Sequence, residues 1–125
     1  LIYRRNVWLK NGGYIVIDRT EAFWVIDVNS GKFNKIKEQE NMIYELNLEA
    51  SKEIARQLRL RDIGGIVVID FIDMKKESHK DSLLSNFRSI LKKDRAKVSI
   101  EDITKLGLVE LTMTRVRSNV SSIFI

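Results

Sequence analysis

A run of apolar, mostly β-branched residues between a glycine pair and an acid dominates the hydrophobic pattern of the chain. Residues 66–69 follow the two glycines and lead directly into Asp70. A short continuous run of this kind is typical of a strand that is buried on both faces of a sheet. Residues 23–29 repeat the pattern and carry Asp27 near their end. We therefore expect two buried strands, each with an aspartate close to its carboxyl end.

Residues 14–18 form a further strand, and only four residues separate them from the segment 23–29. A connection this short predicts an antiparallel hairpin. Side chains alternate between the two faces of a strand, so Asp27 and Asn29 point to the same face. A helix would not place two residues at this spacing on one face.

Two later segments change to a helical period. The first runs from about residue 38 to 60, and its apolar stripe consists of Ile43, Leu46, Ala50, Ile54 and Leu58. The second runs from about residue 75 to 93, and its apolar side chains are Leu83, Phe87, Ile90 and Leu91. Residues 96–100 and 107–112 read as two more strands. The resulting order, ββαβαββ, predicts an α/β fold in which helices pack on a mixed sheet.

Composition narrows the class of protein. The chain has 125 residues, which suits one domain. It contains no cysteine, which excludes a disulfide framework and a thiolate metal site within the chain and fits a reducing cytoplasm. No apolar run is long enough to span a bilayer. The net charge of +5 favours an anionic partner, nucleic acid first.

Asp27 and Asp70 are the candidate metal ligands. Mg²⁺ is usually held by one or two carboxylates, keeps several waters and takes its other ligands from phosphate. Such a site suits metal-assisted attack of water on a phosphodiester. Asn29 lies on the same strand face as Asp27 and can support a carboxylate or a metal-bound water. The pattern leaves one alternative open, in which both acids simply end their strands in solvent.

Three other polar residues are weaker candidates. Asp18 is expected at a hairpin turn, where aspartate is favoured for its turn chemistry. Asp73 is off the strand face of Asp70 and is suited to capping the following helix. His79, the only histidine, lies in a charged helical stretch without a partner at ligand spacing, so we expect a structural role rather than a general base.

A basic loop is expected after the strand that carries Asp27. The positive charge and the aromatic ring of this loop come from Lys32, Phe33, Lys35 and Lys37. Such a loop suits contact with a single-stranded nucleic acid, and a solvated basic loop explains the residues equally well. The large aromatic side chains expected in the core, rather than as platforms for bases, are Trp8, Tyr14 and Trp24.

Four segments closely resemble the bacterial ribonuclease E/G family. They are DVNSGKF at 27–33, NLEA at 47–50, EIARQLRLRDIGG at 53–65 and VIDFIDM at 68–74. The resemblance runs from about residue 7 to 117. It implies the deoxyribonuclease-I-like catalytic subdomain of that enzyme. Residues 1–125 are then expected to be a single catalytic subdomain, a fragment of a longer multidomain ribonuclease.

The resemblance also implies an activity: Mg²⁺-dependent endoribonuclease cleavage of single-stranded RNA, in bacterial cytoplasmic RNA processing and decay. Mn²⁺ is the alternative cofactor, and the products carry 5′-monophosphate and 3′-hydroxyl ends. Asp27 and Asp70 match the metal-binding aspartates of the family, and Asn29 matches the asparagine that supports them. Lys97 stands where the family often has an arginine associated with sensing the RNA 5′ end. Lysine keeps the charge but lacks the bidentate fork.

Other parts of the family enzyme lie outside this chain. They are the S1 RNA-binding domain, the 5′-sensor and the cysteine zinc-link that joins protomers into a homo-oligomer. Zinc is therefore expected only in the full-length protein, and the isolated subdomain is expected to be nearly inactive. The rival hypothesis is a non-catalytic module that binds RNA or a protein partner. A third hypothesis, that the chain is a deoxyribonuclease, rests on fold analogy alone.

Overall fold

The computed structural model describes residues 3–31, 39–101, 103–104 and 107–115. Within these residues it contains six strands and two helices in the order βββαβαββ. The strands are β1 (Asn6–Trp8), β2 (Tyr14–Arg19), β3 (Trp24–Asn29), β4 (Gly65–Asp70), β5 (Lys97–Ile100) and β6 (Leu108–Thr114). The helices are α1 (Glu40–Leu60) and α2 (Glu77–Leu91).

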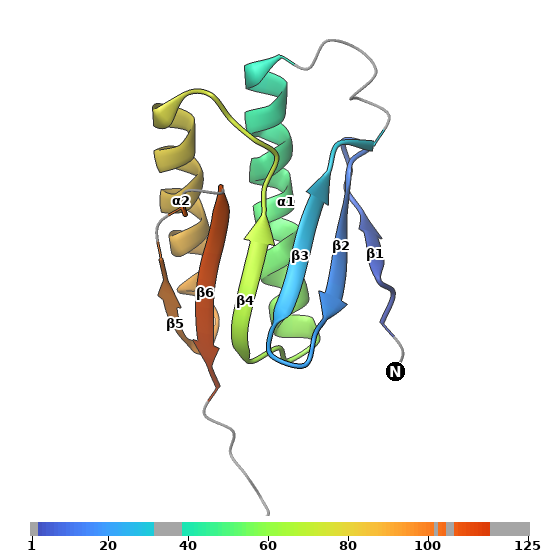
Figure 1. The fold of residues 1–125 in the computed structure, drawn as a ribbon, viewed down its shortest axis with the longest axis vertical. Helices are drawn as coiled ribbons and strands as arrows, with labels where there is room; N and C mark the ends of the chain where they lie inside the picture. Colours follow the sequence, from blue (N-terminus) through green and yellow to red (C-terminus); the bar gives the residue numbers. More distant parts are fainter. Residues whose placement is uncertain (1–2, 32–38, 102, 105–106, 116–125) are drawn as a thin grey trace, which may run out of the picture.

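The six strands form one mixed sheet in the order β1-β2-β3-β4-β6-β5. Strands β3 and β4 pair in parallel, because α1 carries the chain back between them, and the other neighbours are antiparallel. Figure 1 shows both helices on the same side of the sheet. The fold is therefore a two-layer α/β arrangement, and the predicted class, a mixed sheet with helices packed on it, is confirmed.

The sheet is buried on one face only, which corrects the expectation that β3 and β4 are buried on both. In β4, Val67 and Ile69 are fully buried under the helices, whereas Ile66 on the opposite face is 49% exposed. In β3, Ile26 is buried and Asp27 is exposed. Branched apolar residues also fit the pleated backbone of a half-exposed strand, so a continuous apolar run does not require two covered faces. The uncovered side is called the open face below.

The structure adds β1 to the predicted order, as an edge strand paired with β2. Three residues are too few to show an alternating pattern in the sequence. Within β1, Val7 packs against the core, whereas Trp8 points to the open face and is 68% exposed. The expectation that Trp8 belongs to the core is therefore wrong. Trp24 does pack against the core, and Tyr14 is half-buried.

A buried ion pair joins the ends of three elements. The guanidinium of Arg115, just after β6, donates to both carboxylate oxygens of Asp94 at 2.9 and 3.1 Å. The same guanidinium donates to the carbonyl oxygens of Leu58 and Ile63 at 2.8 and 2.6 Å. It thereby holds the end of α1, the approach to β4 and the end of α2 together. This arrangement fixes where β4 begins, and β4 carries Asp70.

Candidate metal centre on the open face of the sheet

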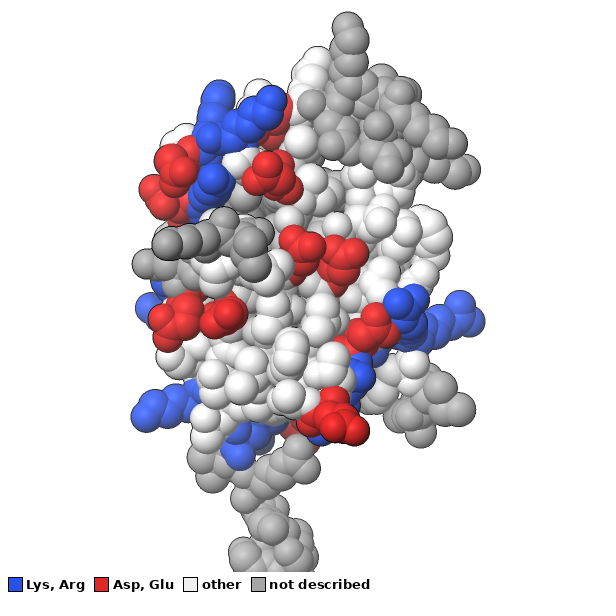
Figure 2. All heavy atoms as spheres, viewed as in Figure 1, with Lys and Arg blue, Asp and Glu red and all other residues white. Residues whose placement is uncertain are grey.

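Asp27 and Asp70 are direct neighbours across the parallel pair β3–β4. Neighbouring strands lie about 4.8 Å apart. Both residues are exposed, and both alternate with buried neighbours that face the helices, so their side chains share the open face. Figure 2 shows acidic side chains near the middle of this face, with uncharged residues around them. The structure thus brings together the two aspartates that the sequence singled out.

The surroundings of both carboxylates disfavour negative charge. Partial burial and then the charge of Asp70 raise the pKa of Asp27, against the effect of a hydrogen bond from the Val28 N–H. Partial burial also raises the pKa of Asp70. Within the described part of the chain, no ion pair involves either residue. Two unneutralised carboxylates side by side form a site that a cation would stabilise.

The two carboxylates suit a hard divalent cation that keeps coordination positions open for other ligands. The described residues contain no group of three or more His, Cys, Asp or Glu side chains able to hold a metal. A closed cage for calcium or a structural zinc site needs more protein ligands than two. Two carboxylates, completed by waters and by phosphate oxygens, are the usual set for Mg²⁺.

Asn29 closes β3 on the same face, two residues beyond Asp27. Its Oδ1 accepts a hydrogen bond from the Gly31 N–H at 2.9 Å, which turns the chain out of the strand. The side-chain amide nitrogen keeps its two protons for donation toward neighbouring groups. Gly31 is required here, because its φ is +63° and an added Cβ would lie 2.6 Å from the Gly12 oxygen.

Asn47 supports the other aspartate, and sequence reasoning missed this role. This residue is fully buried in α1. Its Nδ2 donates to the Ile72 carbonyl at 2.9 Å, and its Oδ1 accepts from the Ile72 N–H at 3.1 Å. Ile72 is two residues beyond Asp70, so the contact holds the chain as it leaves β4. The signal in the sequence was an asparagine beside the apolar stripe of the first helix.

Other candidate residues do not join the acid pair. Asp18 also lies on the open face, but it forms a double ion pair with Arg5 at 2.6 and 2.9 Å, and this hydrogen bonding lowers its pKa. Lys97 pairs with Thr114, six residues along β6 from the partner of Asp70. At about 3.4 Å per residue, Lys97 is roughly 20 Å away along the sheet. The expected basic-loop residues Lys32, Phe33, Lys35 and Lys37 lie outside the described residues.

His79, in α2, contacts two residues of α1. Its Nδ1 lies 2.7 Å from the Glu40 carboxylate, and its ring stacks on Tyr44 at 4.2 Å between centroids. The Glu40 carboxylate also accepts the Lys75 N–H at 2.8 Å. The pKa of Glu40 is lowered, first by the backbone hydrogen bond and then by the one to His79. The cluster ties the start of α1 to the start of α2.

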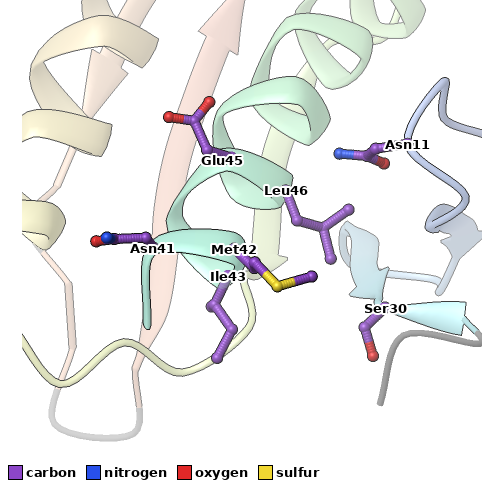
Figure 3. Close-up of a pocket in the computed structure, with 7 residues that line it drawn as sticks. All are labelled: Asn11, Ser30, Asn41, Met42, Ile43, Glu45 and Leu46. Carbon is purple, nitrogen blue, oxygen red and sulfur yellow. The ribbon is translucent and has the colours of Figure 1, made fainter. Parts of the chain in front are cut away.

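Two hollows lie near the ends of β3 and β4. A pocket of about 400 Å³ begins at Asp70, and its polar lining includes Asp73, Lys80 and Thr104. Another pocket, of about 280 Å³, lies where α1 begins (Figure 3). There Met42 and Leu46 point toward the turn residues Asn11 and Ser30, and neither aspartate of the pair contributes. Only the first hollow therefore adjoins the acid pair.

No helix in the described ranges is long and apolar enough to cross a membrane.

Comparison with known proteins relates the sequence of this chain to one family. The model of the "Ribonuclease E/G family" matches residues 1–117. Ribonuclease G of Salmonella typhimurium (strain SL1344) is 47% identical over 119 residues, which are 95% of this chain and 24% of that protein. Ribonuclease E of Synechocystis sp. (strain ATCC 27184 / PCC 6803 / Kazusa) is 50% identical over 121 residues, covering 95% of this chain and 18% of that protein.

Ribonuclease G of Escherichia coli (strain K12) is 45% identical over 119 residues, again 95% of this chain and 24% of the relative. The chain therefore spans about a quarter or less of the length of these curated relatives. The matched residues include β3, α1 and β4, the elements that position the acid pair. This chain belongs to the ribonuclease E/G family.

Proposed function

We propose that this chain is the metal-binding catalytic subdomain of an endoribonuclease that hydrolyses phosphodiester bonds in single-stranded RNA. The observation that carries the proposal is the pairing of Asp27 with Asp70 in register on the open face. Membership of a family whose members are named ribonucleases supports RNA as the substrate. The absence of ion pairs to either carboxylate, among the described residues, supports a cation as the missing partner.

The proposed cofactor is Mg²⁺, with Mn²⁺ as the alternative. When bound, such a cation polarises a phosphoryl oxygen and lowers the pKa of a bound water. Asp27 and Asp70 would hold it through one carboxylate each, and the Asn29 amide would orient a carboxylate or a water. Water would attack phosphorus as the bond from phosphorus to the 3′ oxygen breaks, and the departing oxygen would take up a proton. The products then carry 5′-monophosphate and 3′-hydroxyl ends.

The acid pair alone would not position a flexible RNA strand. Orienting the reactants can contribute about 7–11 kcal/mol of the barrier, and two carboxylates hold only the cation. We therefore propose that efficient cleavage needs RNA-binding parts beyond this chain. The proposed parts are an S1 domain, a 5′-sensor and a zinc-link within a homo-oligomeric parent protein in the bacterial cytoplasm. The residues Lys32, Phe33, Lys35, Lys37 and Lys97 are proposed to add phosphate and base contacts.

The decisive experiment uses the intact protein that contains this chain. Cleavage of a 5′-monophosphorylated single-stranded RNA is measured with Mg²⁺ for the wild type, Asp70→Asn and Asp18→Asn. Asp70→Asn keeps the side-chain shape and removes the charge that anchors the cation, so it should abolish cleavage and leave RNA binding nearly unchanged. Asp18→Asn is the matched control, because it removes a paired carboxylate from the same face, and it should still cleave.

Two outcomes would count against the proposal. Robust cleavage by the Asp70→Asn protein would contradict the assignment of the acid pair. A wild-type protein that binds the RNA without cleaving it would favour the non-catalytic RNA-binding module. The isolated 125-residue chain, assayed beside the intact protein, should show little cleavage.

A further inference from the structure

Trp8 exposes its indole on the open face of the sheet. It is 68% exposed, although tryptophan is usually among the most buried side chains on average. Within the described residues, its ring packs against that of Tyr14 on the neighbouring strand, with centroids 4.9 Å apart and planes inclined at 52°. One side of the indole is thus supported by a second ring. The rest is available to another flat group.

The two rings lie beside the acid pair. Trp8 pairs with Tyr14, and Tyr14 pairs with Asn29, so these three residues form one row across β1, β2 and β3. The next row on the same face contains Asp27 and Asp70. Tyr14 is therefore a diagonal neighbour of Asp27, a relationship with a typical separation of about 7–8 Å. Trp8 is one strand further out.

We propose that Trp8, supported by Tyr14, stacks against a base of the RNA whose phosphate lies at the acid pair. The proposal rests on the function proposed above and names a binding residue for it. Proteins hold single strands by stacking bases on aromatic rings, and this contact is tolerant of sequence because every base has a flat face. The centre of the open face carries acids and uncharged residues, so a base suits the area beside the pair better than a phosphate does (Figure 2).

The size of the exposed apolar surface also favours a base over a protein partner. A stable protein interface buries about 800 Å² on each side, whereas a single aromatic side chain offers about 150–250 Å². Among the residues that the structure describes, the other large exposed apolar side chain of the open face is that of Ile66, at the opposite end of β4 from Asp70. On this face the two rings are bordered by Asn6 and Asn29 and by the half-buried Val16. The patch therefore matches one nucleobase.

RNA binding by the intact protein tests the proposal. All variants are made in the Asp70→Asn protein, so the fluorescently labelled single-stranded RNA stays uncut. Trp8→Ala should raise the Kd about five- to a hundredfold, the range found when a base-stacking ring is removed. Trp8→Phe should keep most of the affinity, because it retains an aromatic face. Met42→Ala is the control, since it removes an apolar side chain that is 47% exposed on α1, and it should leave the Kd unchanged.

A second measurement identifies the contact as stacking. A set of RNAs is prepared in which one nucleotide, at a different position in each RNA, lacks its base. Binding of each RNA is compared between the protein that retains Trp8 and the Trp8→Leu variant. Leucine is chosen because it keeps apolar bulk but has no ring face. At one position, loss of the base should weaken RNA binding by the protein that retains Trp8 and should not affect binding by the Trp8→Leu protein. The same abasic profile in both proteins would overturn the proposal, as would unchanged affinity in Trp8→Ala.

Two further outcomes separate the alternatives. A change in oligomeric mass for Trp8→Ala, measured by light scattering, together with an unchanged abasic profile would assign Trp8 to a protein contact and also overturn the proposal. Loss of the proposed catalytic function would be seen separately, as cleavage that does not depend on Asp70. In that case the binding measurements are made with EDTA, which removes the divalent cation and keeps the RNA uncut, so they still report on stacking.

Discussion

Asn47 and Ile72 are joined by a pair of hydrogen bonds that link α1 to the chain leaving β4. The buried amide satisfies both the N–H and the carbonyl of Ile72, at 3.1 and 2.9 Å. Because Ile72 follows Asp70 by two residues, this contact limits how far the end of β4 can shift. A residue that touches neither substrate nor cation thus supports the position of a candidate ligand.

Replacing Asn47 by Leu should lower both stability and activity. The variant keeps apolar volume but leaves the N–H and the carbonyl of Ile72 without their partner. A fully buried group left unpaired costs about 1–3 kcal/mol, and Ile72 is half-buried, so we expect a loss near the lower end of this range. Urea unfolding of the 125-residue chain measures the loss. In the intact protein, kcat should fall while the Kd for RNA changes little, because the cation site is displaced and the RNA contacts are not. Ser85→Ala, an exposed change on α2, is the control. An Asn47→Leu protein with normal stability would contradict the role of this contact.

Replacing Asp70 by Asn should stabilise the chain when no divalent cation is present. Partial burial raises the pKa of Asp70, so the folded state disfavours the charge that asparagine removes. We expect the melting temperature of Asp70→Asn to lie above that of the wild type. Mg²⁺ should then raise the melting temperature of the wild type in a concentration-dependent way and have no effect on Asp70→Asn.

The matched control for this experiment is Asp18→Asn. It breaks the ion pair with Arg5, so it should not stabilise the chain, and it should still respond to Mg²⁺. Differential scanning calorimetry with and without Mg²⁺ measures all three proteins. Equal stabilisation of the wild type and Asp70→Asn by Mg²⁺ would exclude Asp70 as a ligand.

The buried pair Asp94–Arg115 should make stability depend on pH in acid. Burial alone would raise the pKa of Asp94, but hydrogen bonds from Arg115 and from the Ala96 N–H outweigh it and lower the pKa. A lowered pKa means that the stabilisation is complete above the unfolded-state value of about 3.9 and is lost as pH falls through the folded-state value. Asp94→Asn should therefore be less stable than the wild type at pH 7, and the difference should shrink below about pH 4.

Arg115→Ala should be more damaging than Asp94→Asn at neutral pH. It leaves a buried carboxylate unpaired and removes the donors to Leu58 and Ile63, and breaking a buried pair costs about 3–5 kcal/mol. Urea unfolding between pH 3 and 7 compares these variants with Asp81→Asn, which removes an exposed carboxylate from α2. A constant difference between the wild type and Asp94→Asn across this range would show that Asp94 does not titrate with folding.

Local patterns in the sequence were sufficient for most of the elements and for the part of the site that lies on β3. Helical and strand periods identified both helices and five of the six strands within the described residues, since side-chain direction along one element repeats at a fixed spacing. The same alternation put Asp27 and Asn29 on one face of β3. The three residues of β1 were too few to carry such a pattern.

Only the tertiary structure decided which elements meet. Periodicity describes one strand at a time, whereas the position of Asp27 beside Asp70 depends on the parallel register between β3 and β4, which α1 connects. One face of the sheet is covered and the other is open because both helices pack on the same side. For that reason the sequence could not predict the exposure of Trp8. The role of Asn47 near Asp70 likewise depends on hydrogen bonds between the helix layer and the chain that leaves β4, which spacing along the sequence does not reveal.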